Sequence, residues 1–284
     1  MTRRRSLSES IEFVFGAIEA AGVAIPPGSR FDLMRRVFTD STGAAVQTVA
    51  PQDPNFGVAK EALREFLVLE AILESAEAMS LPDEKRTLKR LCKDAVSPTN
   101  SGNTPGRDLQ TELLVAATCC RGGFSNVQLE EPDVTAMLAD RKWGIAVKRV
   151  KSAGAISDNV RDASEQISRS GLPGMVFLDL SVAFNPEGED VVRPMTADQF
   201  RSCLKYAMTL LLRSHEPTIK ARAASRGVGV VYTFFSCLRS DPIDGWEFAT
   251  MHMDLAIGEI DEAGEALLEF RAAYDCGIKA LTPN

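Results

Sequence analysis

The sequence lacks the residue patterns of a zinc-binding protein. It has six cysteines among 284 residues, but no two of them are spaced as CxxC, and histidine occurs only as His215 and His252. A structural zinc site needs four Cys or His ligands with closely spaced pairs. We therefore expect no zinc site, and cysteines without a pairing pattern favour the reducing cytoplasm.

Long apolar segments are also missing. No stretch offers the roughly 20 apolar residues that span a bilayer. The chain starts with a basic segment and an apolar run, as a signal peptide does, but Glu12 and Glu19 interrupt that run. Glutamates at this spacing suit the solvated face of an amphipathic helix. The sequence thus predicts neither a membrane span nor a signal peptide.

An overall positive charge is absent as well. The net charge of −7 and the pI near 5.1 argue against a general nucleic-acid coat protein, because nonspecific binding depends on Lys and Arg that neutralise phosphates. Basic residues nevertheless gather in segments 141–169 and 201–226, and acids in 241–269. This segregation permits a basic groove on an acidic protein, although solvated helix and strand faces explain it equally well.

What is present fits a globular protein of one large or two smaller cores, with 45% hydrophobic and 25% charged residues. Residues 1–96 show helical periodicity, interrupted by breakers. Residues 97–107 are rich in turn formers and have little to bury. We predict a helical N-terminal domain over 1–96, a linker over 97–107 and a second domain over 108–284.

The second domain alternates between helical and strand patterns. A helix over 108–120 precedes three strands over 126–131, 133–138 and 143–150, which we expect to form a meander. A helix over 157–170 and an apolar strand over 174–180 follow. Further segments complete the domain: helices over 197–213 and 260–274, and strands over 227–238 and 246–255. This order predicts an α/β fold with a mixed sheet flanked by helices.

One lysine stands out on the third strand. A period of two places Ala146, Lys148 and Val150 on one face, so Lys148 shares an otherwise apolar face. Such a lysine either reaches water at the sheet margin or has a charged partner in a cleft. Glu131 and Asp133 lie on the same side of the extended chain before the second strand. They either form a plain acidic turn, or the strand pairing brings Asp133 to Lys148.

The element order, with Glu-Pro-Asp at 131–133 and Ala-Val-Lys at 146–148, resembles the PD-(D/E)XK nuclease superfamily, which has the restriction-endonuclease-like fold. The resemblance covers about residues 108–181. In that family an aspartate opens the second strand, an acid and a lysine lie on the third, and a glutamate often enters from the first helix. The corresponding residues here are Asp133, Ala146, Lys148 and Glu112. Alanine therefore stands where the family has an acid.

The resemblance implies a cytoplasmic DNA endonuclease that hydrolyses phosphodiesters with Mg²⁺ or Mn²⁺, in a setting such as bacterial defence or DNA repair. Carboxylates suit this metal, which neutralises charge on the phosphate. Asp133 and Glu112 would hold the metal with help from Glu131, and Lys148 would orient the attacking water. The residues expected to contact substrate are Gln166, Arg149 and Lys151.

Two alternatives stay open. Because of Ala146, the chain is also interpretable as a degenerate nuclease fold that binds nucleic acid or protein without cutting. A structural or interaction protein, in which Lys148 only reaches water, would gather no carboxylates around this lysine. Asp162 is expected to point to solvent, opposite the apolar face of its helix. The N-terminal domain is expected to bind a protein partner or a second copy.

Overall fold

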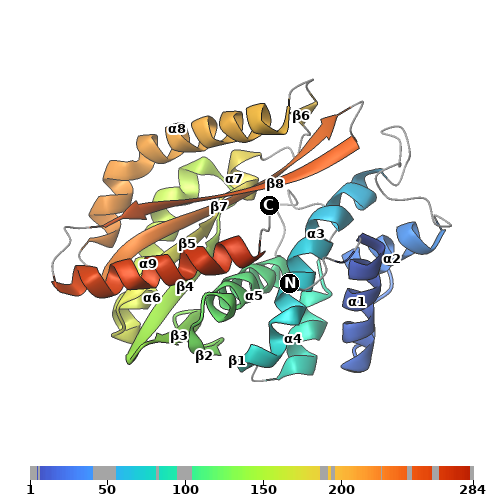
Figure 1. Ribbon diagram of the computed structural model, residues 1–284, viewed down its shortest axis with the longest axis horizontal. Coiled ribbons are helices and arrows are strands. Elements are labelled where there is room, and N and C mark those ends of the chain that lie inside the picture. The colour runs from blue at the N-terminus through green and yellow to red at the C-terminus, as the bar shows by residue number, and fades with distance from the viewer. Residues whose placement is uncertain are drawn as a thin grey trace.

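The computed structural model describes residues 5, 7–40, 56–80, 83–94, 104–185, 191–192, 196–224, 226–241, 245–257 and 262–281. Its N-terminal part is mainly helical (Figure 1). The elements are α1 (Leu7–Ala20), α2 (Arg30–Asp40), α3 (Phe56–Glu74), the 3₁₀ turn η2 (Ala76–Ala78), strand β1 (Met79–Ser80) and α4 (Glu84–Leu91). Helix α1 buries Val14 and Ile18 and exposes Glu12 and Glu19. The predicted amphipathic helix is thus confirmed.

The remaining elements follow the predicted alternation of helices and strands. They are α5 (Pro105–Arg121), β2 (Ser125–Gln128), β3 (Val134–Leu138), β4 (Arg141–Arg149), η3 (Ala153–Ala155), α6 (Ile156–Ser170), β5 (Gly174–Asp179), α7 (Ser181–Phe184), β6 (Val191–Val192), α8 (Ala197–Ala223), β7 (Val228–Asp241), β8 (Gly245–Ala256) and α9 (Glu262–Leu281). Among the helices that the structure describes, none is both long and apolar enough to cross a membrane.

The strands form one mixed sheet in the order β1-β2-β3-β4-β5-β7-β6, with β8 also paired to β7. Strands β2, β3 and β4 make the expected antiparallel meander, and β5 joins β4 in parallel after α6. Strand β7 continues in parallel beside β5 and turns back into β8. The chain is therefore an α/β fold with a mixed sheet and flanking helices, as predicted.

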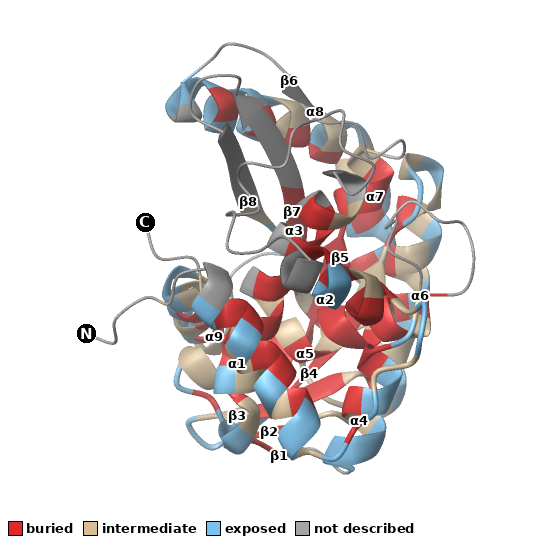
Figure 2. Ribbon diagram, turned by 90° about the vertical axis from the view of Figure 1, so that its right-hand side faces the viewer, coloured by how far each residue is buried: buried red, intermediate tan, exposed pale blue. Residues whose placement is uncertain are grey.

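Helices cover both faces of this sheet and give the fold two apolar cores (Figure 2). One core joins α5, α9 and the helices of the N-terminal part to one face. The other core lies under α6 and α8. Strand β4 contributes to both cores, because Ile145 and Val147 enter the first core, while Ala146, and Val150 directly after the strand, enter the second. The predicted alternation in β4 is confirmed, and its two faces meet different surroundings.

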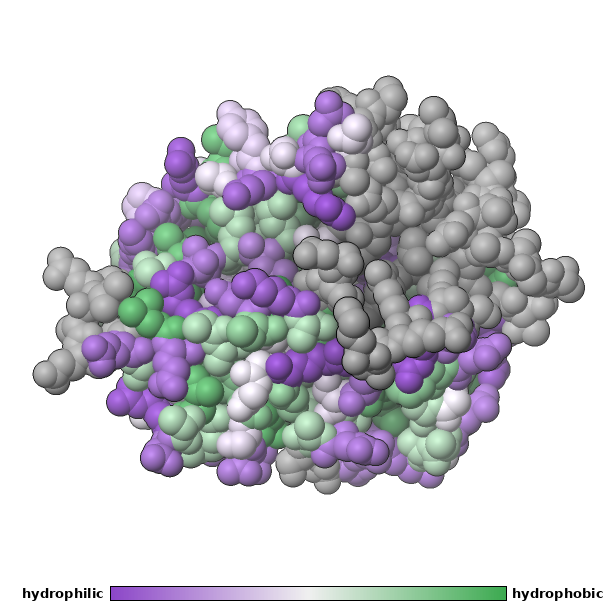
Figure 3. Space-filling model, in the orientation of Figure 1, coloured by the Kyte–Doolittle hydropathy of each residue, from purple (hydrophilic) through white to green (hydrophobic). Residues whose placement is uncertain are grey.

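The start of α5 lies earlier than the sequence suggests. Pro105 occupies the first turn, where its missing N–H costs nothing, so 105–107 of the predicted linker are helical. Residues 97–103 of that linker lie outside the described residues. At its other end α5 packs closely against α9, because a Cβ on Gly277 would overlap the carbonyl oxygen of Thr118. The face over α9 and α5 mixes hydrophilic and hydrophobic side chains (Figure 3).

Candidate active site

Asp133 lies immediately before β3 and faces the end of β4. Its Oδ2 accepts a hydrogen bond from the backbone N–H of Val147 at 2.7 Å and lies 3.4 Å from Nζ of Lys148. Pairing of Val134 with Ile145 places Asp133 opposite Ala146 in the same ladder. The structure therefore joins the predicted carboxylate and lysine, which lie 15 positions apart in the chain.

Gln166 of α6 holds Asp133 from a third side. Its Nε2 donates to the carbonyl oxygen of Pro132 at 3.0 Å and lies 3.5 Å from Oδ1 of Asp133. Its Oε1 is buried and accepts no hydrogen bond from the described residues. Gln166 thus holds the segment around Asp133 through the Pro132 carbonyl oxygen.

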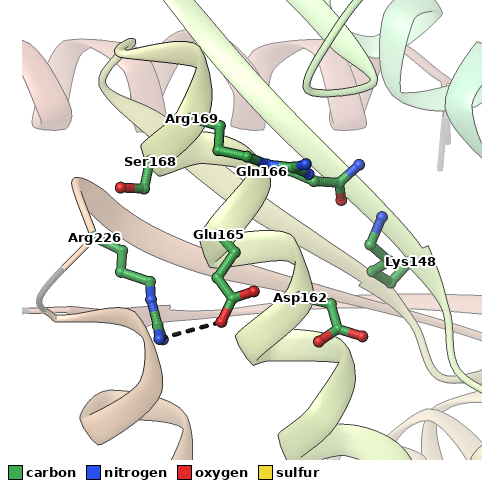
Figure 4. Close-up of a pocket in the computed structure, with 7 residues that line it drawn as sticks. All are labelled: Lys148, Asp162, Glu165, Gln166, Ser168, Arg169 and Arg226. Atoms are coloured by element: carbon green, nitrogen blue, oxygen red, sulfur yellow. Dashed lines mark hydrogen bonds and ion pairs between the residues drawn. The ribbon is translucent and has the colours of Figure 1, made fainter.

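Lys148 opens onto a hollow beside α6. The hollow has a volume of about 590 Å³ and is lined by Lys148, Asp162, Glu165, Gln166, Ser168, Arg169 and Arg226 (Figure 4). The Lys148 side chain is 22% exposed, so it is neither sealed in the core nor free in solvent. Asp162 is exposed, as predicted, but it borders the same hollow as Lys148, below it in Figure 4.

Glu112 of α5 is an acid held in an unfavourable place for its charge. Partial burial raises its pKa to about 7, and the negative charges of Asp133 and Asp108 add to this. Burial also raises the pKa of Asp133, against the opposing effects of Lys148 and the Val147 N–H. The charge of Asp133 thus raises the pKa of Glu112, while the charge of Lys148 lowers the pKa of both acids.

Glu131 does not join these carboxylates as the sequence suggested. Residues 131–133 form a turn rather than an extended segment, since Pro132 has no N–H with which to pair. The exposed Glu131 lies 3.5 Å from Arg169 of α6. The charge of Glu131 still acts on Asp133 and raises its pKa, although burial raises that pKa more.

The two remaining predicted substrate contacts lie away from the hollow. Arg149 leaves the opposite face of β4, where its Nη1 donates to Oγ1 of Thr104 at 3.3 Å and its Nε lies 3.8 Å from Asp179. Lys151 is exposed and near Asp108, whose pKa it helps to lower against burial. Ala146, at the position where the family has an acid, is fully buried in the second core.

Sequence reasoning missed Asp108 and Arg226. Asp108 lies one turn before Glu112 on α5, a spacing that places both on one side of the helix and could have drawn attention to it. Burial raises its pKa as well. Arg226 follows α8 and reaches the hollow through Glu165, at 3.3 Å. No local pattern predicts that contact, because 61 positions separate the two residues.

Glu112 and Asp133 are the carboxylates suited to a metal ion here. Within the described residues, no group of three or more His, Cys, Asp or Glu side chains is placed to hold one. Mg²⁺ commonly binds through one or two carboxylates and completes its shell with water and phosphate oxygens. A divalent cation would also relieve the repulsion between the two partly buried acids. The oxygen donors of these two acids therefore suit Mg²⁺ or Mn²⁺ in chemical type.

Comparisons with family models, curated proteins and solved structures return no match for this chain.

Proposed function

We propose that this chain is a metal-dependent DNA endonuclease with a restriction-endonuclease-like core, formed by α5, β2, β3, β4, α6 and β5. The observation that carries the proposal is the 3.4 Å approach of Lys148 to Asp133, whose charges both act on the partly buried carboxyl group of Glu112. A lysine that merely reached water would not need these acids around it. The element order agrees with the resemblance to the PD-(D/E)XK superfamily.

Each residue has a task that its surroundings support. Asp133 and Glu112 would hold Mg²⁺ or Mn²⁺, which when bound supplies positive charge to the scissile phosphate. Lys148 would donate hydrogen bonds to the attacking water and to a phosphate oxygen. Gln166 keeps Asp133 in place through the Pro132 carbonyl. Water oxygen would bond to phosphorus and release one proton to solvent, as the bond to the leaving sugar oxygen breaks and the leaving oxygen takes a proton from solvent.

Cleavage of plasmid and linear DNA in Mg²⁺ or Mn²⁺, abolished by EDTA, is the direct test. Lys148→Met and Asp133→Asn should each lower the rate about 100-fold or more, because they remove positioned charge from the transition state. Asp158→Asn is the matched control, since Asp158 lies on α6 but does not line the hollow. Loss of cleavage in this control, or none in the wild type with either metal, would contradict the proposal.

The second metal ligand can be assigned by comparing two acids. Glu112→Gln should abolish cleavage, while Asp162→Asn should change it little, because Asp162 is exposed and its carboxylate already pairs with Arg161 at 2.9 Å. Asp162 nevertheless borders the hollow with Lys148. The reverse result would move the second ligand from α5 to α6.

Ala146 favours a second candidate function, a nuclease fold that binds nucleic acid or protein without cutting. The fully buried alanine removes the acid expected beside Asp133. Binding of DNA without cleavage in either metal would support this candidate. Ala146→Glu then becomes informative. It should lower stability without metal, because position 146 is fully buried, and it should tighten Mn²⁺ binding if Asp133 and Glu112 form a working site.

A further inference from the structure

Strand β8 forms a long border of the sheet. Among the described residues it pairs only with β7, from Gly245 opposite Asp241 to Ala256 opposite Val230. The two strands run together as a long hairpin (Figure 1). With 12 residues, β8 is about twice as long as a typical strand. An edge strand of this length presents a row of backbone groups to which another strand can bind.

The bonds between β7 and β8 show which backbone groups of β8 point outward. The N–H of Ile257, directly after β8, donates to the carbonyl oxygen of Gly229 at 3.0 Å. Backbone groups alternate along an antiparallel strand, so the odd-numbered residues of β8 face β7 and the even-numbered residues face outward. Within the described part of the chain, no backbone group bonds to the outward ones, which belong to Trp246, Phe248, Thr250, His252, Asp254 and Ala256.

Side-chain exposure also indicates an open border at β8. Residues 230–235 of β7 are all buried, with exposed fractions of 7% or less. Their partners on β8, residues 251–256, are half-buried or exposed. Met251, Met253 and Leu255 pack against the second core without being covered completely. A further strand beside β8 would therefore bury apolar side chains as well as pair backbone groups.

The sequence of β8 lacks the features that prevent pairing at an edge. Residues 245–256 contain no Lys, Arg or Pro, and the register with β7 runs without a bulge. A two-fold axis makes such an antiparallel edge complementary to a second copy of itself. With the axis near Met251, residue 247 lies across from 255, and residue 254 lies across from 248. Glu247 and Asp254 are then each opposite an apolar residue instead of another acid.

We propose that β8 pairs in antiparallel orientation with β8 of a second copy of this chain and joins the two sheets into one. The assembly closes as a dimer, because the pairing uses the open border of both copies. The opposite border of the sheet offers only β1, which has 2 residues. Lys148 lies on β4, which β5 and β7 separate from β8. The inference is therefore independent of the proposed nuclease function.

Light scattering on the full chain over a dilution series tests the dimer. At high concentration the molar mass should be twice the 30.8 kDa of the chain, and it should fall toward that value on dilution. Thr250→Pro removes one outward N–H and keeps the bonds to β7, since proline is tolerated where an edge N–H faces outward. It should weaken association about tenfold or more. Thr250→Lys places like charges near the axis and should also weaken association, which covers a proline variant that fails to fold.

Tyr206→Ser is the matched control at another exposed position. Tyr206 is 67% exposed on α8, where Leu204 and Met208 are the buried neighbours, so it lies on the helix side away from the sheet. This variant should dimerise as the wild type does. A monomeric Tyr206→Ser beside dimeric Thr250 variants would place the interface on α8 and overturn the proposal.

Hydrogen exchange, measured residue by residue, identifies the paired strand. In the dimer, the outward N–H of His252 should exchange slowly, as the inward ones of Met251 and Met253 do. In monomeric Thr250→Lys, the N–H of His252 should exchange about tenfold faster or more, while Met251 and Met253 stay protected by β7. A wild type that is monomeric at every concentration overturns the proposal. So does slow exchange of His252 in the monomeric variant, which would mean that one copy covers its own border.

Discussion

Lys148 and Arg149 are consecutive residues of β4, yet the two faces of the sheet treat their charges in opposite ways. Lys148 is 22% exposed, borders an open hollow and has one close acid, Asp133. Arg149 is 4% exposed and belongs to a sealed group of arginines and acids between α3, α5 and the strand ends. One face leaves its charges accessible at an open hollow, and the other uses charges to join helices to the sheet.

Removing the central acid of the sealed face should have the largest effect. Glu65 is 2% exposed and pairs with guanidinium groups from α2, α3 and α5, so Glu65→Gln leaves buried arginines without their counterion. We expect a loss of about 3–5 kcal/mol in the free energy of unfolding, measured by urea denaturation. A loss below about 1 kcal/mol would mean that this face is as tolerant as the open one.

Substituting methionine for each of the two consecutive residues Lys148 and Arg149 of β4 compares the two faces of the sheet directly. Arg149→Met should cost about 2–3 kcal/mol, because it leaves Asp179 partly uncompensated in a buried place. Lys148→Met should change stability by less than about 1 kcal/mol, since Asp133 keeps the Val147 N–H. Urea denaturation of both variants at one pH gives the comparison. Equal losses would remove the distinction between the faces.

Glu112 makes the open side sensitive to pH. Its folded-state pKa is raised from 4.5 to about 7, so between these values the folded state binds more protons than the unfolded state. The ionisation of Glu112 therefore lowers the free energy of unfolding as the pH rises through that window. In EDTA and near pH 4.5, the free energy of unfolding of Glu112→Gln should match that of the wild type. Above pH 7 the variant should be more stable than the wild type, by on the order of 1–2 kcal/mol.

Mn²⁺ provides the control for Glu112. A cation bound to the two acids favours the charged carboxylate, so adding Mn²⁺ should stabilise the wild type and narrow its difference from Glu112→Gln at high pH. Thermal unfolding at two pH values, with and without metal, measures this. A Glu112→Gln variant that is less stable than the wild type at high pH in EDTA would show that the carboxylate has a favourable partner.

The smallest effect is expected at the rim of the open face. Glu131 and Arg169 are 60% and 70% exposed and lie 3.5 Å apart. Glu131→Gln should change the free energy of unfolding by less than about 0.5 kcal/mol, because solvent screens such pairs. Urea denaturation beside Glu65→Gln compares two glutamate–arginine contacts that differ mainly in burial. A larger loss would indicate that the turn before β3 depends on this contact.

Local patterns predicted much of the fold and half of the site. The period of two in β4 placed Lys148 with Ala146, and the order of strands brought Asp133 to Lys148, because both follow from nearest-neighbour pairing. The turn at Pro132 and the burial of Arg149 were not predictable in this way. The turn at Pro132 is held by Gln166, and Arg149 meets Thr104, and these pairs lie 34 and 45 positions apart. The alternation of side chains along a strand shows that Arg149 and Lys148 lie on opposite faces of the sheet, but it does not show which residues Arg149 contacts.

The contacts of Arg30 have a practical consequence for handling the protein. This fully buried side chain of α2 donates to Gln110 of α5 at 2.8 Å and to the carbonyl oxygen of Leu91 at 2.9 Å, and the surrounding apolar core is shared. A protease cut between residues 94 and 104 would therefore yield two fragments that stay associated and co-elute on size exclusion. Either fragment produced by itself would present a bare apolar surface, so the two should be co-expressed.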